Sequence, residues 1–236
     1  MPAAEPWRPR LFDPFAWLLS RRELRLLTRA AGDDVEKLYE VTEAYQGRGF
    51  YARIHAVQNR REIVALATRV RALDPQVVVE IGTFKGGTLF LWCQVAKPRL
   101  VVSIDLPGGE YGGGFDQRRA RLYREFLAAR PGSEMALLRA DSHLPATRHA
   151  LLDKLAGAPI DFLYIDGDHS YDGVRADFED YATLVRPGGL IAFHDIVTRT
   201  AGHEVHRLWP EIRGRYRHEE LVDNPAGNKG LGLLWV

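Results

Sequence analysis

Residues 164–174, YIDGDHSYDGV, bring carboxylates and an imidazole together within a short segment. Asp166, Asp168 and His169 follow directly after the apolar run DFLYI at 161–165. Charged side chains are rare inside buried strands, so these groups are expected where a strand ends. A carboxylate beside an imidazole can orient the ring for proton transfer, and both groups can bind a divalent cation. The segment therefore predicts a chemical site at the end of a strand.

Apolar, β-branched runs predict the strands that must position this site. Near-continuous runs of this kind are typical of strands buried on both faces of a parallel sheet. The predicted strands cover 77–82, 100–106, 135–142, 161–168 and 190–196. Segments of helical character separate them at 87–96, 117–130, 145–156 and 172–185. This alternation predicts an α/β, doubly wound sheet, with the turn into the fifth strand at 187–189.

The two ends of the chain differ from this pattern. Residues 1–55 predict a helical cap, in which 20–23 and 33–36 resemble capping boxes that begin helices. The tail from His218 predicts two strands joined by a loop rich in Pro, Gly and Asn. We therefore expect a mostly parallel, seven-stranded sheet over 56–236, with a C-terminal antiparallel hairpin and an N-terminal helical cap.

Polar residues gather at the carboxyl ends of all five central strands. They are Glu80 and Gly82, Asp105, Asp141 and Ser142, Asp166 and Asp168, and His194 and Asp195. Ligands of an open α/β sheet bind outside these ends, at the topological switch point. Alternatively, each carboxylate only caps the helix that follows, which accounts better for a single Asp than for the whole set.

The loop after the first strand indicates the kind of ligand. Its glycines in 82–87 are spaced G-x-x-x-G-G, which does not match the dinucleotide fingerprint G-x-G-x-x-G. Glu80, just before the loop, would repel a pyrophosphate and favour a cationic ligand. Asp105 can accept hydrogen bonds from ribose hydroxyls, and Asp141 with Ser142 could meet an adenine edge. The set favours S-adenosyl-L-methionine over a nicotinamide dinucleotide.

Three ordered motifs resemble those of class I S-adenosylmethionine-dependent methyltransferases. They are EIGTFKGGT (80–88), IDGDHSY (165–171) and RPGGLIAFHD (186–195). Over roughly 58–196, the chain resembles the methyltransferase 24-like subgroup, which is related to catechol-type O-methyltransferases. This resemblance implies a Rossmann-like fold and O-methylation of a small-molecule hydroxyl on a sugar, a phenol or a secondary metabolite.

The resemblance also implies roles for single positions. The residues expected around the cofactor are Glu80, Gly82, Thr83, Gly86, Thr88, Asp105, Asp141, Ser142 and Asp166. Of these, the glycine loop would contact the methionine part, Asp105 the ribose, and Asp141 with Ser142 the adenine. Gln58 and Glu62 are further candidates for the wall of the pocket.

Removal of the proton from the acceptor hydroxyl has two alternative accounts. In the first, His169 is the general base, because imidazole has an unperturbed pKa of about 6.5; Asp166 orients it and His194 is a second candidate base. In the second, implied by the resemblance, Asp166, His194 and Asp195 bind Mg²⁺ or Mn²⁺, which acidifies the hydroxyl. His194 departs from those relatives, which carry an acidic residue there.

Composition bears on partners and location. Lys and Arg number 32 against 31 Asp and Glu, so the net charge of +1 gives no reason to expect nucleic acid. Cys93 is the only cysteine, which fits a reducing cytoplasm, and Asp13 with Pro14 interrupts the N-terminal apolar stretch. We therefore expect a cytoplasmic protein with no signal peptide and no membrane span.

Two further segments carry expectations. The glycine-rich loop at 107–119 could close over the ligand as a lid, with apolar contacts from Tyr111 and Phe115. The N-terminal helices are expected to cover the same rim, or their aromatic residues could form a homodimer contact. These residues are Trp7, Phe12, Phe15 and Trp17.

Two other functions compete with methyl transfer. One is a nicotinamide-dependent oxidoreductase on a Rossmann-like fold, against which the glycine spacing and Glu80 argue. The other is a non-catalytic S-adenosylmethionine-binding module, against which the presence of Asp166, His169 and Asp195 argues.

Overall fold

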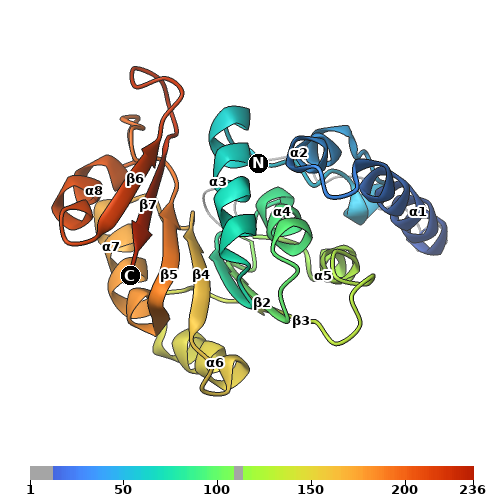
Figure 1. The fold of residues 1–236 in the computed structure, drawn as a ribbon. Helices are drawn as coiled ribbons and strands as arrows, with labels where there is room; N and C mark the ends of the chain where they lie inside the picture. Colours follow the sequence, from blue (N-terminus) through green and yellow to red (C-terminus); the bar gives the residue numbers. More distant parts are fainter. Residues whose placement is uncertain (1–12, 109–113) are drawn as a thin grey trace, which may run out of the picture.

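The computed structural model describes residues 13–108 and 114–236, and its centre is a seven-stranded sheet (Figure 1). The strands are β1 (Val77–Ile81), β2 (Leu100–Asp105), β3 (Glu134–Arg139), β4 (Ile160–Ile165), β5 (Val185–Phe193), β6 (Arg217–Leu221) and β7 (Leu231–Trp235). Their order across the sheet is β3-β2-β1-β4-β5-β7-β6. Strands β1 to β5 pair in parallel, whereas β7 is antiparallel to both β5 and β6. The predicted sheet and its C-terminal antiparallel hairpin are confirmed.

Helices cover both faces of the sheet (Figure 1). One side carries α1 (Asp13–Ala31), α2 (Val35–Ala44), α3 (Arg60–Leu73), α4 (Gly87–Val95) and α5 (Ala120–Glu125). The other side carries α6 (Pro145–Leu155), α7 (Tyr171–Tyr181) and α8 (Val205–Arg213). Short 3-10 helices η2 (Gly49–Tyr51), η3 (Gln117–Arg119) and η4 (Ala182–Leu184) complete the connections. Within the described ranges, no helix combines the length and apolarity that crossing a membrane requires.

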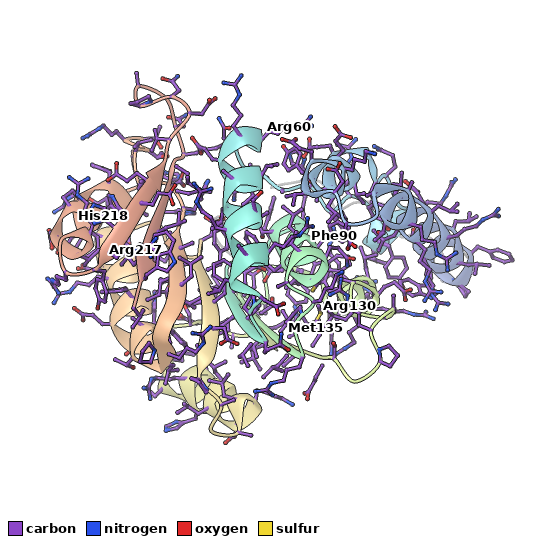
Figure 2. The ribbon with its side chains drawn as sticks, in the orientation of Figure 1. Arg60, Phe90, Arg130, Met135, Arg217 and His218 are labelled. Carbon is purple, nitrogen blue, oxygen red and sulfur yellow. The ribbon has the colours of Figure 1, made fainter. Side chains whose placement is uncertain are left out.

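Alternation along the strands divides the interior into two cores. In β1, Val78 faces the core under α3 and α4, while Val77 and Val79 face the core under α6 to α8. Figure 2 shows Phe90 of α4 inside the first of these layers, where its side chain is fully buried. Each central strand therefore has an apolar neighbour on both faces, which explains its nearly continuous apolar sequence.

The N-terminal helices pack on the same core as α3 and α4. Trp17 of α1 meets the ring of Tyr51 edge-on at 5.1 Å, and both side chains are buried. Phe15 is 69% exposed, while Trp7 and Phe12 lie outside the described residues. The homodimer contact and a separate cap over residues 1–55 both stay predictions.

One of the two expected capping boxes is wrong. Ser20 does not begin a helix, because it lies inside α1, whose described part runs over Asp13–Ala31. Its hydroxyl accepts a hydrogen bond from Arg48 N at 2.9 Å. The second box holds with a shift of one residue. Asp34 caps α2 and accepts from Lys37 N at 3.1 Å.

Strand ends and one helix also differ from expectation. β4 ends at Ile165 and β3 at Arg139, so Asp141, Ser142 and Asp166 lie on loops that leave the sheet. The turn expected at 187–189 belongs to β5, where the pairing with β4 shifts register. Helix α8 was not predicted, because Pro210 stands inside it and Pro disfavours a helix interior.

An ion pair joins the loop after β3 to α7. His143 Nε2 lies 3.3 Å from Oδ1 of the fully buried Asp177 and 3.2 Å from Gly173 O. Asp177, followed by the weaker influence of Asp141 and Asp168, raises the pKa of His143 to about 9 despite partial burial. The imidazolium therefore compensates a carboxylate that has little contact with water.

This pair predicts a pH-dependent stability. Because the pKa of His143 is about 6.5 in an unfolded chain and about 9 in the fold, its contribution is complete below pH 6.5 and is lost as the pH rises through 9. After allowance for screening, it amounts to about 1–2 kcal/mol. Urea unfolding of the wild type and of H143Q should therefore show a stability difference that shrinks between pH 6 and pH 10. The exposed His149 supplies the control, and H149Q should unfold in urea like wild type at pH 6. A pH-independent difference for H143Q would contradict the assignment.

Candidate active site

Close backbone packing shapes the glycine loop after β1. Gly82 has φ of 89°, and a Cβ there would stand 2.0 Å from the carbonyl oxygen of Asp166. Gly86 has φ of 80° as the N-cap of α4, and a Cβ there would stand 2.5 Å from the Tyr123 ring. Only glycine satisfies both the left-handed backbone and the lack of space. The loop therefore rests directly on the end of β4, beside Asp166.

Arg119 holds this loop against the chain that precedes α3. Its guanidinium donates to Lys85 O at 3.0 Å and to Ala52 O at 2.7 Å. The same side chain donates to Tyr123 Oη at 2.9 Å, and that hydroxyl donates to Phe84 O at 2.8 Å. Two loop carbonyls thus have fixed directions before any ligand arrives.

Glu80 lies buried below the loop. One carboxylate oxygen accepts from Trp92 Nε1 at 3.0 Å, while the other has no hydrogen-bond partner. Burial raises the pKa of Glu80 to about 8, although the hydrogen bonds from Thr88 and Trp92 oppose the shift. Thr88 and Thr83 are also buried, and the Thr83 hydroxyl bonds with that of Ser103. Glu80 therefore keeps one acceptor unsatisfied beneath the loop.

Asp105 is held by backbone amides at the end of β2. Its carboxylate accepts from Phe84 N at 2.8 Å, Leu106 N at 2.9 Å and Gly114 N at 3.1 Å. Burial raises its pKa against the effect of these bonds. Within the described residues, these amides occupy three of the about four acceptor positions of the carboxylate.

The remaining predicted cofactor residues lie on the side of α7. Asp141 Oδ1 accepts from His143 N at 2.9 Å, and Ser142 O accepts from Tyr181 Oη at 2.5 Å. In the expected lid, Phe115 is buried against Tyr123, and their ring centroids lie 4.9 Å apart. Tyr111 lies outside the described residues, so the lid stays a prediction.

Four side chains converge where β4 and β5 end. We call them the His/Asp cluster: Asp166, His169, His194 and Asp195. His169 Nε2 lies 3.2 Å from Asp166 Oδ1 and 3.3 Å from Asp195 Oδ2. His194 Nδ1 lies 3.0 Å and 3.4 Å from the same two oxygens. Nitrogen and oxygen atoms therefore alternate around a closed ring.

Neutral donors hold the outer oxygens of the two carboxylates. Gln58 Nε2 donates to Asp166 Oδ2 at 2.9 Å, and Tyr164 Oη donates to the same oxygen at 3.3 Å. Thr198 Oγ1 donates to Asp195 Oδ1 at 2.7 Å. Each carboxylate therefore directs its other oxygen toward the two histidines.

Electrostatics in the cluster favour charged carboxylates and charged imidazoles. Burial alone would raise the pKa of Asp166 and of Asp195, but the neighbouring histidines outweigh it and hold both pKa values low. Burial alone would lower the pKa of His194, but Asp166 and Asp195 raise it to about 10, and the pKa of His169 is raised in the same way. In the absence of another cation, protons on the imidazoles balance the carboxylates.

His194 is the most enclosed imidazole of the cluster. Its side chain is 7% exposed, and neither ring nitrogen meets an acceptor in hydrogen-bond geometry. His169 is 27% exposed and does form a hydrogen bond with Asp166. The cluster therefore has a closed inner side at His194 and a more open side at His169.

The structure adds a third histidine that the sequence did not indicate. His203 Nε2 lies 3.7 Å from Asp195 Oδ2, and its ring centroid lies 4.8 Å from that of His169. The next residue, Glu204, donates its N–H to His169 O at 2.7 Å, which fixes this approach. His203 lies on an irregular loop whose path depends on this contact, so no periodic pattern marks it.

The two candidates for the pocket wall have different positions. Gln58 reaches Asp166 as described, and its other amide atom is buried without a partner. Glu62 instead accepts from Asp223 N at 2.9 Å and Gly230 N at 3.0 Å. Glu62 therefore anchors the loop between β6 and β7.

Comparison with known proteins gives one family and several relatives. Residues 79–196, half of the chain, match the family described as a methyltransferase domain. An uncharacterised protein of Sinorhizobium fredii, y4gI, is 31% identical over 147 residues, which are 61% of this chain and 16% of that protein. The uncharacterised protein R132 of Acanthamoeba polyphaga mimivirus is 32% identical over 163 residues, with 68% and 66% covered. The chain thus spans less than two thirds of the length of either relative.

Solved structures share the fold along most of their length. Calicheamicin methyltransferase CalS11 aligns with a TM-score of 0.60 at 15% identity, covering 100% of this chain and 99% of that one. An O-methyltransferase of Bacillus cereus in complex with SAH gives 0.56 at 18% identity, with 90% and 100% covered. TomG, an O-methyltransferase of Streptomyces achromogenes in complex with SAM, gives 0.55 at 19% identity, with 92% and 98% covered.

The family match covers the glycine loop, Asp105 and the His/Asp cluster in one continuous stretch. The strand order and the fold of the solved relatives agree with it. The chain therefore belongs to the methyltransferase domain family, and its predicted class I methyltransferase fold is confirmed.

Proposed function

We propose that the protein transfers the methyl group of S-adenosyl-L-methionine to a hydroxyl oxygen of a small molecule. One observation carries the proposal: the glycine loop packs on the backbone of Asp166, whose side chain belongs to the His/Asp cluster. A cofactor on the loop and an acceptor at the cluster would then be immediate neighbours, as in-line methyl transfer requires. Solved relatives that are O-methyltransferases in complex with SAM or SAH support the same reaction.

The cofactor would lie along the carboxyl ends of β1, β2 and β3. We assign its methionine part to the loop above Glu80, where one buried oxygen of the carboxyl group has no partner within the described residues. We assign the ribose to Asp105, a carboxylate acceptor that backbone amides hold at the end of β2. Asp141 and Ser142 would stand at the adenine edge, as the resemblance implies.

The acceptor would approach from the more open side of the cluster. A hollow of about 300 Å³ lies between the loop that follows Asp195 and the β6–β7 loop. Its lining includes Val197, Arg199, Thr200 and residues 225–228. The acceptor's reacting hydroxyl would extend from there to His169, the exposed member of the cluster.

Methyl transfer to oxygen requires that the acceptor lose its proton. We assign this step to the His/Asp cluster, where an imidazole in its neutral form could accept the proton and a bound cation could stabilise an alkoxide or phenolate. A divalent ion, when bound by Asp166, His194 and Asp195, would supply acidification of the hydroxyl. Gln58 and Thr198 would keep the two carboxylates oriented during the reaction.

Cofactor binding gives the first test of the proposal. In D105N one of the two carboxylate oxygens becomes an NH₂ donor, so the amide network and the ribose contact cannot both persist. Calorimetry should show S-adenosylhomocysteine binding to wild type and binding about 10- to 100-fold weaker to D105N. D153N, an equal charge change on the exposed outer surface of α6, should bind like wild type. Tight binding of NADH with none of S-adenosylhomocysteine would contradict the proposal.

The role of the cluster gives the second test. H169Q removes the imidazole but keeps a polar side chain, so we expect kcat to fall about 10²- to 10⁴-fold. S-adenosylhomocysteine affinity should stay within about threefold of wild type, because the loop is unchanged. The measurement is S-adenosylhomocysteine formation with a panel of phenols, catechols and sugars in buffer containing Mg²⁺ or Mn²⁺. H149Q should behave as wild type, and full turnover by H169Q would exclude the cluster from the reaction.

A further inference from the structure

We infer that the His/Asp cluster is a mixed imidazole–carboxylate centre for a divalent transition metal of the Mn²⁺ to Zn²⁺ series, with His169 as a fourth ligand. The inference deepens the proposed function and rests on it, since the ion would act on the same acceptor hydroxyl. From the sequence, only Asp166, His194 and Asp195 were expected as ligands, and the expected ion was Mg²⁺ or Mn²⁺. The inference adds His169 as a ligand and excludes Mg²⁺ as the preferred ion.

The spacing of the four inner atoms carries the inference. Around the ring, the four nitrogen–oxygen distances are 3.2, 3.3, 3.4 and 3.0 Å. Nitrogen and oxygen ligands bind such metals at about 2.0–2.2 Å, which places neighbouring ligand atoms about 2.9–3.5 Å apart. All four ligand atoms also lie within 4.8 Å of one another. The ring therefore has the dimensions of a first coordination shell.

The surroundings of the ring resemble the outer shell of a metal site. Each carboxylate has one oxygen in the ring and the other held by a neutral donor, from Gln58 and Tyr164 for Asp166 and from Thr198 for Asp195. Such outer partners orient metal ligands in proteins. Within the described part of the chain, no Lys or Arg nitrogen lies within 4.0 Å of either carboxylate. The two inner oxygens thus face only imidazoles.

His194 provides an independent observation. It is more than nine-tenths buried, and neither of its nitrogens has a hydrogen-bond partner. Its Nδ1 points toward the inner oxygens of Asp166 and Asp195. A buried polar atom without a partner is costly, whereas coordination would satisfy Nδ1 fully. A structural histidine at this position would be expected to form at least one aligned hydrogen bond.

The donor set determines which metals fit. Two imidazole nitrogens and two carboxylate oxygens suit Mn²⁺, Fe²⁺, Co²⁺ and Zn²⁺, whereas Mg²⁺ favours oxygen ligands and retains several waters. The replacement of an acidic residue by His194 therefore changes the preferred ion. His203, 3.7 Å from Asp195 Oδ2, adds a further imidazole at the open side of the ring.

The test measures metal binding directly, on the full chain after treatment with a chelator. Calorimetric titrations with CoCl₂ and with MgCl₂ should give one Co²⁺ site, at least about 100-fold tighter than Mg²⁺. In H194D, which restores an oxygen donor, the ratio of the two dissociation constants should shrink at least about tenfold. H169Q should weaken Co²⁺ binding about 10- to 100-fold, and H149Q should leave it unchanged.

A spectroscopic measurement identifies the ligands independently of affinity. Pulsed electron paramagnetic resonance of bound Mn²⁺ should show nitrogen coupling in wild type and weaker coupling in both H194D and H169Q. Absence of Co²⁺ binding, equal affinity for Mg²⁺ and Co²⁺, or unchanged nitrogen coupling in H169Q would overturn the inference. Because H169Q alters a partly exposed side chain, it serves as the test if H194D does not fold.

The same protein distinguishes failure of this inference from failure of the proposed function. Binding of S-adenosylhomocysteine to protein that binds no Co²⁺ would overturn the metal centre alone. Binding of Co²⁺ to protein that binds no S-adenosylhomocysteine would support the metal centre and overturn the proposed methyl transfer.

Discussion

Two carboxylates, Asp166 and Asp195, stand side by side at the ends of neighbouring strands, and positive charge between them is the condition on which the site depends. Like charges in a partly buried place repel strongly unless a cation separates them. His169 and His194 contribute that charge when protonated, and both lie within 3.4 Å of the carboxylates. A divalent ion would supply the same compensation without the protons.

Several elements serve this arrangement. Parallel pairing of β4 with β5 brings their carboxyl ends together, and Asp195 leaves β5 with a left-handed φ of 63°. The segment before α3 contributes Gln58, and the loop after β5 contributes Thr198. Because Gly82 has no Cβ, the glycine loop can pack directly on the backbone of Asp166. A change in any of these contacts would reach both the proposed cofactor and the proposed acceptor.

The amino-acid sequence predicts those features that repeat or that follow directly from strand ends. Apolar runs located the five parallel strands, and the polar residues after them located Asp166, His194 and Asp195. His203 and the role of Glu62 escaped prediction because they depend on tertiary contacts of irregular loops. Helix α8 escaped it because Pro210 contradicts local helix preference, while burial of Trp209 and Ile212 favours the helix.

The most direct measurement is a crystal structure of the protein with S-adenosylhomocysteine and MnCl₂. It tests whether the cofactor site and the His/Asp cluster are neighbours at the carboxyl ends of the strands. We expect the methionine part of the ligand along residues 82–87 with its sulfur toward Asp166 and its ribose at Asp105. We also expect an anomalous manganese peak among His169, His194 and the two carboxylates. A nucleoside bound elsewhere, or a cluster without manganese whose histidines face solvent, would contradict these expectations.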